Sequence, residues 1–156
     1  MIQKIISGGQ TGADRAALDF AIANHIAHGG WIPRGRRTED GALPSSYGLT
    51  ETVSSHYAVR TEQNILAADG TLIVSFGPLS NGSLLTKRLA QRHGKPCLCV
   101  DCDHEPLEWA AELIRSWLKD NAIGVLNVAG PRASKEPRIY DAVLQLLQSL
   151  LATHGH

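Results

Sequence analysis

The stretch IQKIISGGQTGAD, residues 2–14, decides the fold. Its apolar start, residues 2–6, predicts a buried strand, and the glycines that follow end that strand. A helix is predicted next, with Thr11 as its N-cap and Asp14 three residues later, the spacing of a capping box. The buried face of this helix is expected at apolar positions that recur at helical spacing, namely Leu18, Ala21, Ile22 and Ile26. A strand that leads through a glycine turn into a helix is the building unit of parallel α/β sheets.

The same alternation of apolar runs and amphipathic segments continues along the chain. Further strands are expected at 31–32, 71–76, 96–100 and 124–128, and further helices at 60–68, from the 80–81 turn to about 93, from 106 and from 137. Residues 35–55 lack clear periodicity and are expected to form a long loop. The sequence therefore predicts an α/β fold, a three-layer Rossmann-like doubly wound sheet of about five mainly parallel strands. This single domain is expected over 1–152, with a frayed tail at 153–156.

The composition is that of an ordinary globular protein. The 156 residues are 43% hydrophobic and 19% charged, which argues against intrinsic disorder. The formal net charge of +0 does not indicate nucleic-acid binding, and it favours self-association into a homo-oligomer. No apolar run approaches the roughly 20 residues that span a bilayer, and the N-terminus does not resemble a signal peptide. We therefore expect a soluble, cytoplasmic protein that binds neither nucleic acid nor membrane.

The first glycine turn is the strongest candidate for a binding site. Doubly wound sheets bind ligands beyond the carboxyl ends of their strands, where glycines let the backbone approach an anion and the first N–H groups of a helix point at it. The pattern fits neither G-x-G-x-x-G nor a Walker sequence, so it does not favour a dinucleotide or a nucleoside triphosphate. A tight turn before a capped helix would explain the same residues without a ligand. The residues expected to contact the ligand are Gly8, Gly9, Gln10, Thr11, Gly12 and Asp14. On this hypothesis, Gly12→Asp removes anion binding and leaves the fold intact.

Two later turns repeat this arrangement and point to a phosphorylated small molecule. The turn after the strand at 71–76 offers Gly77, Asn81, Gly82 and Ser83, with Ser80 or Asn81 as a helix cap. Arg132 follows the last strand and could hold a phosphate through two parallel hydrogen bonds, and Arg34 follows the strand at 31–32. Ordinary turn formation and a solvated basic loop would explain these residues equally simply.

Neither a metal site nor a catalytic group stands out. Cys97, Cys99 and Cys102 have C-x-C-x-x-C spacing, but no second Cys/His cluster completes a set of four ligands. Cys97 and Cys99 alternate along a strand that is expected to be buried, where free cysteine behaves as a small apolar residue. We therefore expect core thiols and no intrinsic protein metal site. No Ser-His-Asp or Cys-His arrangement is evident, so no catalytic residue is assigned.

Four segments resemble a known family. They are GGQTGAD at 8–14, GWIPRG at 30–35, YAVRTEQN at 57–64 and DGTLIV at 69–74. These segments are similar to those of the molybdenum carrier family, and the resemblance covers nearly the whole chain. That family belongs to a Rossmann-like superfamily that includes the lysine-decarboxylase-like phosphoribohydrolases and the DNA-processing protein DprA.

The resemblance implies a non-catalytic carrier of the molybdenum cofactor (molybdopterin), or of a related phosphorylated pterin, that brings its own metal. Molybdoenzymes that receive the cofactor would be partners. The residues that the resemblance places along the pocket are Gly9, Gln10, Thr11, Gly12, Arg34, Asn81, Gly82 and Ser83. It implies further that Arg60, Thr61 and Asn64 shape the pocket wall.

Two other functions stay open. A nucleotide-acting enzyme of the phosphoribohydrolase kind requires a carboxylate in the pocket, for which Asp14, Glu51 and Glu62 are candidates. Those enzymes carry Pro-Gly-Gly-x-Gly-Thr-x-x-Glu after a central strand, and this chain has a Thr or Leu where that glutamate is expected. The departure argues against N-glycosidic hydrolysis. The other alternative is a regulatory module that binds a nucleotide without hydrolysing it.

Overall fold

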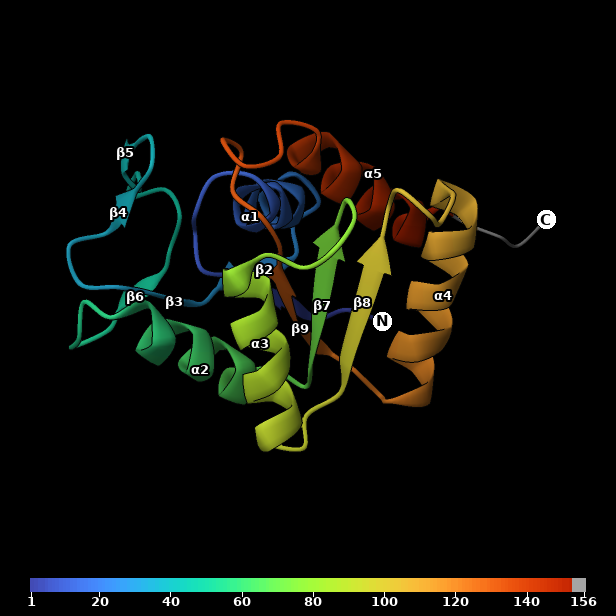
Figure 1. Ribbon diagram of the computed structural model, residues 1–156, viewed down its shortest axis with the longest axis horizontal. Coiled ribbons are helices and arrows are strands. Elements are labelled where there is room, and N and C mark those ends of the chain that lie inside the picture. Colours follow the sequence, from blue (N-terminus) through green and yellow to red (C-terminus); the bar gives the residue numbers. More distant parts are fainter. Residues whose placement is uncertain (153–156) are drawn as a thin grey trace.

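Five parallel strands form one sheet at the centre of the molecule. The computed structural model describes residues 1–152, so the tail expected at 153–156 lies outside the described residues. The strands, each parallel to its neighbours, are in sheet order β2 (Ala27–Gly29), β1 (Lys4–Ile6), β9 (Val125–Ala129), β7 (Gly70–Ser75) and β8 (Cys97–Asp101) (Figure 1). This arrangement confirms the predicted Rossmann-like α/β fold.

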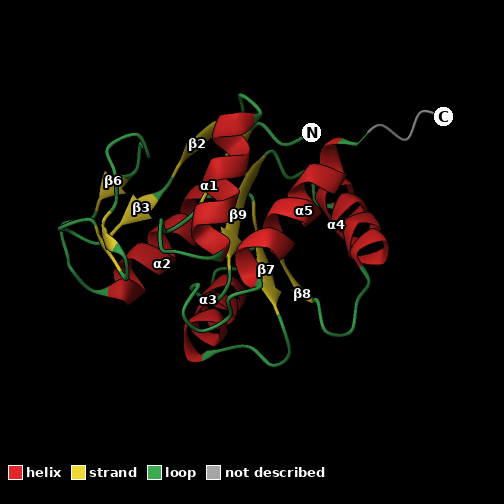
Figure 2. Ribbon diagram, turned by 90° about the horizontal axis from the view of Figure 1, so that it is seen from above, coloured by secondary structure: helices red, strands yellow, loops and turns green. Residues whose placement is uncertain are grey.

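Helices cover both faces of the sheet. All six residues of β7 are buried, which is typical of a parallel strand covered on both sides. One face carries α1 (Ala13–Ala23), α4 (Leu107–Asp120) and α5 (Ile139–Leu151), whose apolar sides share the main core. The other carries α2 (Tyr57–Ala67) and α3 (Asn81–Arg92), which enclose a smaller cluster of Ile65, Leu89 and Ala90 (Figure 2).

The order of the strands leaves β9, the last along the chain, between β1 and β7. From β1 the chain crosses one face through α1 to β2, and from β7 it crosses the opposite face through α3 to β8. The carboxyl ends of β1, β9 and β7 therefore meet where the two crossovers diverge. Doubly wound sheets leave a crevice for ligands at this point.

The second strand of the sheet is not where the sequence predicted it. The helix expected to continue to about Gly29 ends at Ala23, and the chain turns at His25 (φ 56°) into β2 at the sheet edge. Ile26 keeps the apolar spacing of the helix but lies in this turn and packs on the core, so the spacing was misleading. The segment predicted as a strand of the sheet, β3 (Trp31–Ile32), pairs instead with β6 (Thr50–Glu51) in a separate two-stranded sheet.

Residues 35–55 are more ordered than a long loop. They contain the antiparallel hairpin of β4 (Arg37–Thr38) and β5 (Gly41–Ala42). The guanidinium of Arg36 donates hydrogen bonds to four backbone carbonyl groups of the segment, those of Leu43, Pro44, Tyr47 and Leu49. These polar contacts, together with the burial of only Leu43 and Leu49 against Leu18 and Ile32, order the segment without an apolar period in the sequence.

The bounds of the other helices were predicted to within a few residues, but one residue predicted to face the core is exposed. Ile22 was expected in the core but is 42% exposed, since it lies on the outer side of its helix. Pro106 is the N-cap of α4 rather than its first residue. Across residues 1–152, none of the helices combines the length and the apolar character that crossing a bilayer requires.

Candidate functional site

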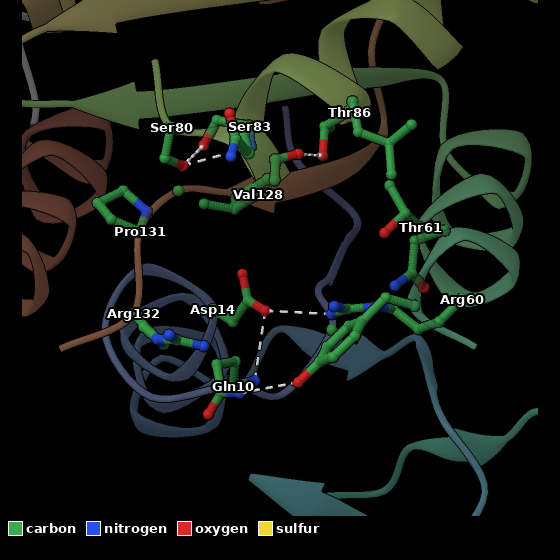
Figure 3. A pocket seen from close by; sticks show the side chains of 18 of the residues that line it. Gln10, Asp14, Arg60, Thr61, Ser80, Ser83, Thr86, Val128, Pro131 and Arg132 are labelled. Carbon is green, nitrogen blue, oxygen red and sulfur yellow. Dashed lines mark hydrogen bonds and ion pairs between the residues drawn. The ribbon is translucent and has the colours of Figure 1, made fainter. Parts of the chain in front are cut away.

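A cavity of about 470 Å³ opens at the carboxyl ends of β1, β9 and β7. This volume lies within the range of small-molecule pockets. Ser80 and Ser83 of the α3 turn lie on one side of the cavity, and Asp14 and Arg60 lie on the other (Figure 3). Three cations and one carboxylate line the cavity: Arg60, Arg132, Lys135 and Asp14. The excess of positive charge favours an anionic ligand.

Most of the expected site residues meet in this cavity, although they come from four separate segments. Those that line it are Gly8, Gln10, Asp14, Arg60, Thr61, Asn64, Asn81, Gly82, Ser83 and Arg132. The sequence did not single out Tyr57, Thr86, Asn127 and Lys135, which also line it. A polar residue inside a buried strand was a signal that could have identified Asn127. No local pattern marks Tyr57 or Lys135, because only the tertiary fold brings them to the cavity.

The start of α3 presents hydrogen-bond donors to the cavity. The Ser80 hydroxyl caps the helix by accepting a bond from the Ser83 N–H at 3.4 Å, which confirms Ser80 as one of the two predicted caps. Within residues 1–152, no acceptor partners the backbone N–H groups of Asn81 and Gly82. The first turn of α3 contains no acidic residue. These amides, at the positive end of the helix dipole, form a site suited to an anion.

The first glycine turn satisfies part of its amides with groups of the chain itself. The N–H of Gln10 donates to Asp14 Oδ2 at 3.3 Å, and that of Thr11 donates to the Gln10 side-chain oxygen at 3.0 Å. The N–H of Ala13 donates to the Pro131 carbonyl at 3.2 Å. The expectation of open amides at this helix start was therefore wrong for these three groups, because local side chains and the loop after β9 reach them first.

The predicted cap of the first helix was also wrong. Gly12, not Thr11, is the N-cap residue, and α1 has no side-chain cap. The Thr11 hydroxyl accepts a hydrogen bond from the Ala133 N–H at 3.1 Å and donates one to Glu39. Gly12 has φ +81°, and a Cβ atom there would lie 2.6 Å from the Pro131 carbonyl oxygen. Gly12→Asp would therefore disturb the fold and cannot isolate ligand binding.

A buried ion pair forms the wall opposite α3. Arg60 Nη1 lies 3.4 Å from Asp14 Oδ2, and both side chains are almost wholly buried. Burial raises the pKa of the Asp14 carboxyl, and the nearby Arg60 guanidinium opposes part of that rise. A Cβ atom at Gly8 would overlap Arg60 Nη1 at 1.4 Å, so a side chain there would displace the guanidinium from Asp14. The Arg60 guanidinium also stacks over the Tyr57 ring, 5.1 Å from its centroid.

Asn64 is used for structure at the edge of the cavity. Its side-chain oxygen accepts a bond from the Trp31 N–H at 2.7 Å, and its amide nitrogen donates to the Trp31 carbonyl at 3.1 Å. This pair of bonds fixes α2 to β3. Asn64 therefore positions the wall that carries Arg60 and Thr61, as the resemblance implied for a wall residue.

Five expected residues lie outside the cavity lining. Gly9 faces Ile32, Leu43 and Leu49, Thr11 and Gly12 pack against the loop after β9, and Gly77 donates its N–H to Asp101. Arg34 is exposed next to the 35–55 segment. Of the three candidate carboxylates, only Asp14 lines the cavity. Glu51 accepts a bond from the Gly35 N–H, and Glu62 pairs with His93.

Glu39 joins the 35–55 segment to two of the cavity loops. Its carboxylate accepts hydrogen bonds from the Thr11 hydroxyl and from the Ser134 N–H and hydroxyl, and it lies 3.4 Å from Arg132 Nε. We call these contacts the Glu39 latch. Hydrogen bonds from Ser134 and then Thr11 lower the pKa of the Glu39 carboxyl.

The Glu39 latch is expected to weaken in acid. The pKa of the Glu39 carboxyl is lower in the folded state than in the unfolded chain, where it is near 4.5. Ionised Glu39 therefore contributes its full stabilisation above about pH 4.5, and this stabilisation is lost as the pH falls through the folded-state pKa. Glu39→Gln should therefore flatten the fall of stability below about pH 4.5, as measured by chemical denaturation from pH 7 to pH 3. Glu51→Gln, in the same segment, controls for the loss of a carboxylate. If the free energy of unfolding of Glu39→Gln falls below about pH 4.5 as steeply as that of the wild-type protein, the Glu39 latch is contradicted.

The cysteines are free and half-buried rather than fully buried as expected. Cys97 packs against the cluster between α2 and α3, and Cys102 packs on the main core. Among the residues that the structure describes, no three His, Cys, Asp or Glu side chains gather closely enough to hold a metal ion.

Comparisons with known proteins place the chain in a family. A crystal structure named "Putative molybdenum carrier protein", from Syntrophus aciditrophicus SB, is 56% identical in sequence and has a TM-score of 0.95, with 97% of this chain and 96% of that chain covered. A search of curated proteins found no match. The model of the circularly permutated YpsA SLOG family matches residues 5–151. The family resemblance seen in the sequence is thus confirmed, and the chain belongs to the circularly permutated YpsA SLOG family.

Proposed function

We propose that this chain is a binding or carrier protein for the molybdenum cofactor or a related phosphorylated pterin, held in the cavity beyond β1, β9 and β7. The observation that carries the proposal is the pair of open amides at Asn81 and Gly82 in a cavity with excess positive charge. The solved relative named as a molybdenum carrier, at 56% identity, supports the same ligand class.

The phosphate of the ligand binds at the start of α3 in this proposal. The amides of Asn81 and Gly82 and the hydroxyl of Ser83 donate to it, and Arg132 and Lys135 supply positive charge from the loop after β9. Of the three glycine turns, the second therefore binds the phosphate, whereas the first shapes the cavity through Gly8 and Asp14. The metal enters with the pterin, so the protein needs to hold only the organic part and its phosphate.

A nucleotide-acting enzyme remains the second candidate, because Asp14 places a buried carboxyl with a raised pKa in the cavity. A carboxyl of this kind is suited to proton transfer. In this structure it is bound by Arg60 and the Gln10 N–H, which leaves its second oxygen for a ligand. A nucleotide-binding regulatory module would use the same cavity without turnover.

The decisive experiment identifies what the protein carries. Native mass spectrometry of the purified protein, combined with elemental analysis, is expected to show a phosphorylated pterin and molybdenum bound in stoichiometric amount. Anaerobic calorimetric titration with the molybdenum cofactor should give one site per chain and no turnover. Absence of heat at protein concentrations well above micromolar would contradict the proposal. Release of free base from nucleoside monophosphates would support the enzyme instead.

A carrier role of this kind predicts transfer partners. We propose that molybdoenzymes lacking their cofactor receive it from this protein in the cytoplasm. Mixing the loaded protein with such an apoenzyme should restore its activity, and a control with the unloaded protein should not.

A further inference from the structure

Asn127 is an unusual residue for its position. It lies in the middle of β9, the central strand, opposite Ile6 of β1 and Thr71 of β7. Central strands of parallel sheets are covered on both faces and are normally apolar. The neighbours Leu126 and Val128 follow this rule and belong to the main core, so Asn127 points to the opposite face, toward α2 and α3. There it lines the cavity while only 4% exposed.

Most of the hydrogen-bond donors and acceptors of the Asn127 side chain have no partner among residues 1–152. A side-chain amide offers two N–H donors and an oxygen with two acceptor sites. Within residues 1–152, its side chain makes a single hydrogen bond, from Nδ2 to the Thr71 hydroxyl at 3.2 Å. Because a hydroxyl both donates and accepts, Thr71 can hold the amide in either orientation, and the remaining face can offer a carbonyl or an N–H to a ligand.

The two ends of the cavity differ in chemistry. Asn81 and Gly82, with their open amides, are exposed, whereas Ser83, Thr86 and Asn127 are buried. A charged phosphate therefore remains at the solvent end, and the uncharged part of the ligand extends toward Asn127. A buried amide pairs best with a ring edge that carries a hydrogen-bond donor next to an acceptor.

We propose that Asn127 is a specificity-determining residue that reads the amide-like edge of a bicyclic heterocycle. The 2-amino-4-oxo pyrimidine edge of pterin and guanine places a donor beside an acceptor, as the N6/N7 edge of adenine also does, whereas unsubstituted purine offers acceptors only. This inference rests on the proposed function and narrows it, because it states which ring the cavity accepts and which it rejects.

The test compares three probes of equal charge in calorimetric titrations: neopterin monophosphate, GMP and purine riboside 5′-monophosphate. The wild-type protein is expected to bind neopterin monophosphate and GMP at least about tenfold more tightly than purine riboside 5′-monophosphate, the usual effect of one or two buried hydrogen bonds. In Asn127→Leu this preference should fall to within about twofold. If that variant does not fold, Asn127→Thr keeps a hydroxyl beside Thr71 and lacks the amide.

Thr71→Val is the matched control. It removes the same bond between Asn127 and Thr71 and leaves the amide in place, so it should retain most of the preference for GMP over purine riboside 5′-monophosphate. An equal loss in both variants would show that Asn127 acts only through the fold, and would overturn the inference.

The outcomes separate this inference from the proposed function. If the wild-type protein binds all three probes equally, the role of Asn127 is overturned and the phosphate site stands. If it binds none of them and no inorganic phosphate either, the proposed function fails, and the inference fails with it.

Discussion

Replacing Gly12 with alanine is expected to lower the free energy of unfolding by about 3 kcal/mol. The backbone at Gly12 has φ +81°, a region that costs an L-residue about 1–2 kcal/mol. The new Cβ would also lie 2.6 Å from the Pro131 carbonyl oxygen and 2.7 Å from the Ala133 nitrogen. Since these are backbone atoms, α1 and the loop after β9 would have to separate, with a further cost typical of overpacking. Chemical denaturation measures the difference.

Gly94→Ala is the control for this prediction. Gly94 also has a positive φ, +63°, but a Cβ there meets no atom within 4 Å. The free energy of unfolding of this variant should fall by only about 1 kcal/mol, the cost of placing an L-residue at a positive φ. Equal losses in the two variants would mean that the close approach of α1 to the loop after β9 contributes nothing to stability.

Gly82→Asp is expected to weaken phosphate binding roughly 100-fold while leaving the fold intact. Position 82 has open space for a side chain, and its backbone is not in the left-handed region. A carboxylate there would lie beside the amides proposed to hold the phosphate and would repel it. The same charge near a helix N-terminus stabilises the helix by about 0.3–1 kcal/mol. Binding and stability should therefore change in opposite directions, as measured by calorimetric titration with neopterin monophosphate and by thermal denaturation.

Gly82→Ala separates charge from size at this position. It adds a side chain without charge and should keep the affinity within a few-fold of the wild type. If Gly82→Asp binds as tightly as the wild-type protein, the start of α3 is not the phosphate site. If both variants lose affinity equally, the effect is steric and the electrostatic argument is wrong.

The sheet and the edge that carries the site could be predicted because they depend on local patterns. Residues 71–76, TLIVSF, are a mostly apolar run, and the fully buried β7 occupies nearly the same positions. Each glycine turn follows such a run, so the turns had to lie at the carboxyl ends of parallel strands. The edge strand β2 was missed because its three residues are too short a segment to show a period.

The use of each turn could not be predicted, because it depends on side-chain contacts between distant segments. The glycines of the first and second turns look equivalent in sequence. At the first turn, the Pro131 carbonyl arrives from the far end of the chain and accepts the Ala13 N–H, while Asp14 folds back onto Gln10. No described group accepts the amides of Asn81 and Gly82 in the same way. Only the structure shows which amides of each turn have an acceptor in the chain itself.

The central position of β9 also has a consequence for synthesis on the ribosome. Until residues 125–129 have left the exit tunnel, β1 with β2 and β7 with β8 are separate strand pairs that no backbone hydrogen bond joins. Each pair exposes an unpaired inner edge, and such edges promote association between nascent chains. Residues 125–129 therefore join the two strand pairs, and a chain truncated before this segment is expected to be prone to aggregation.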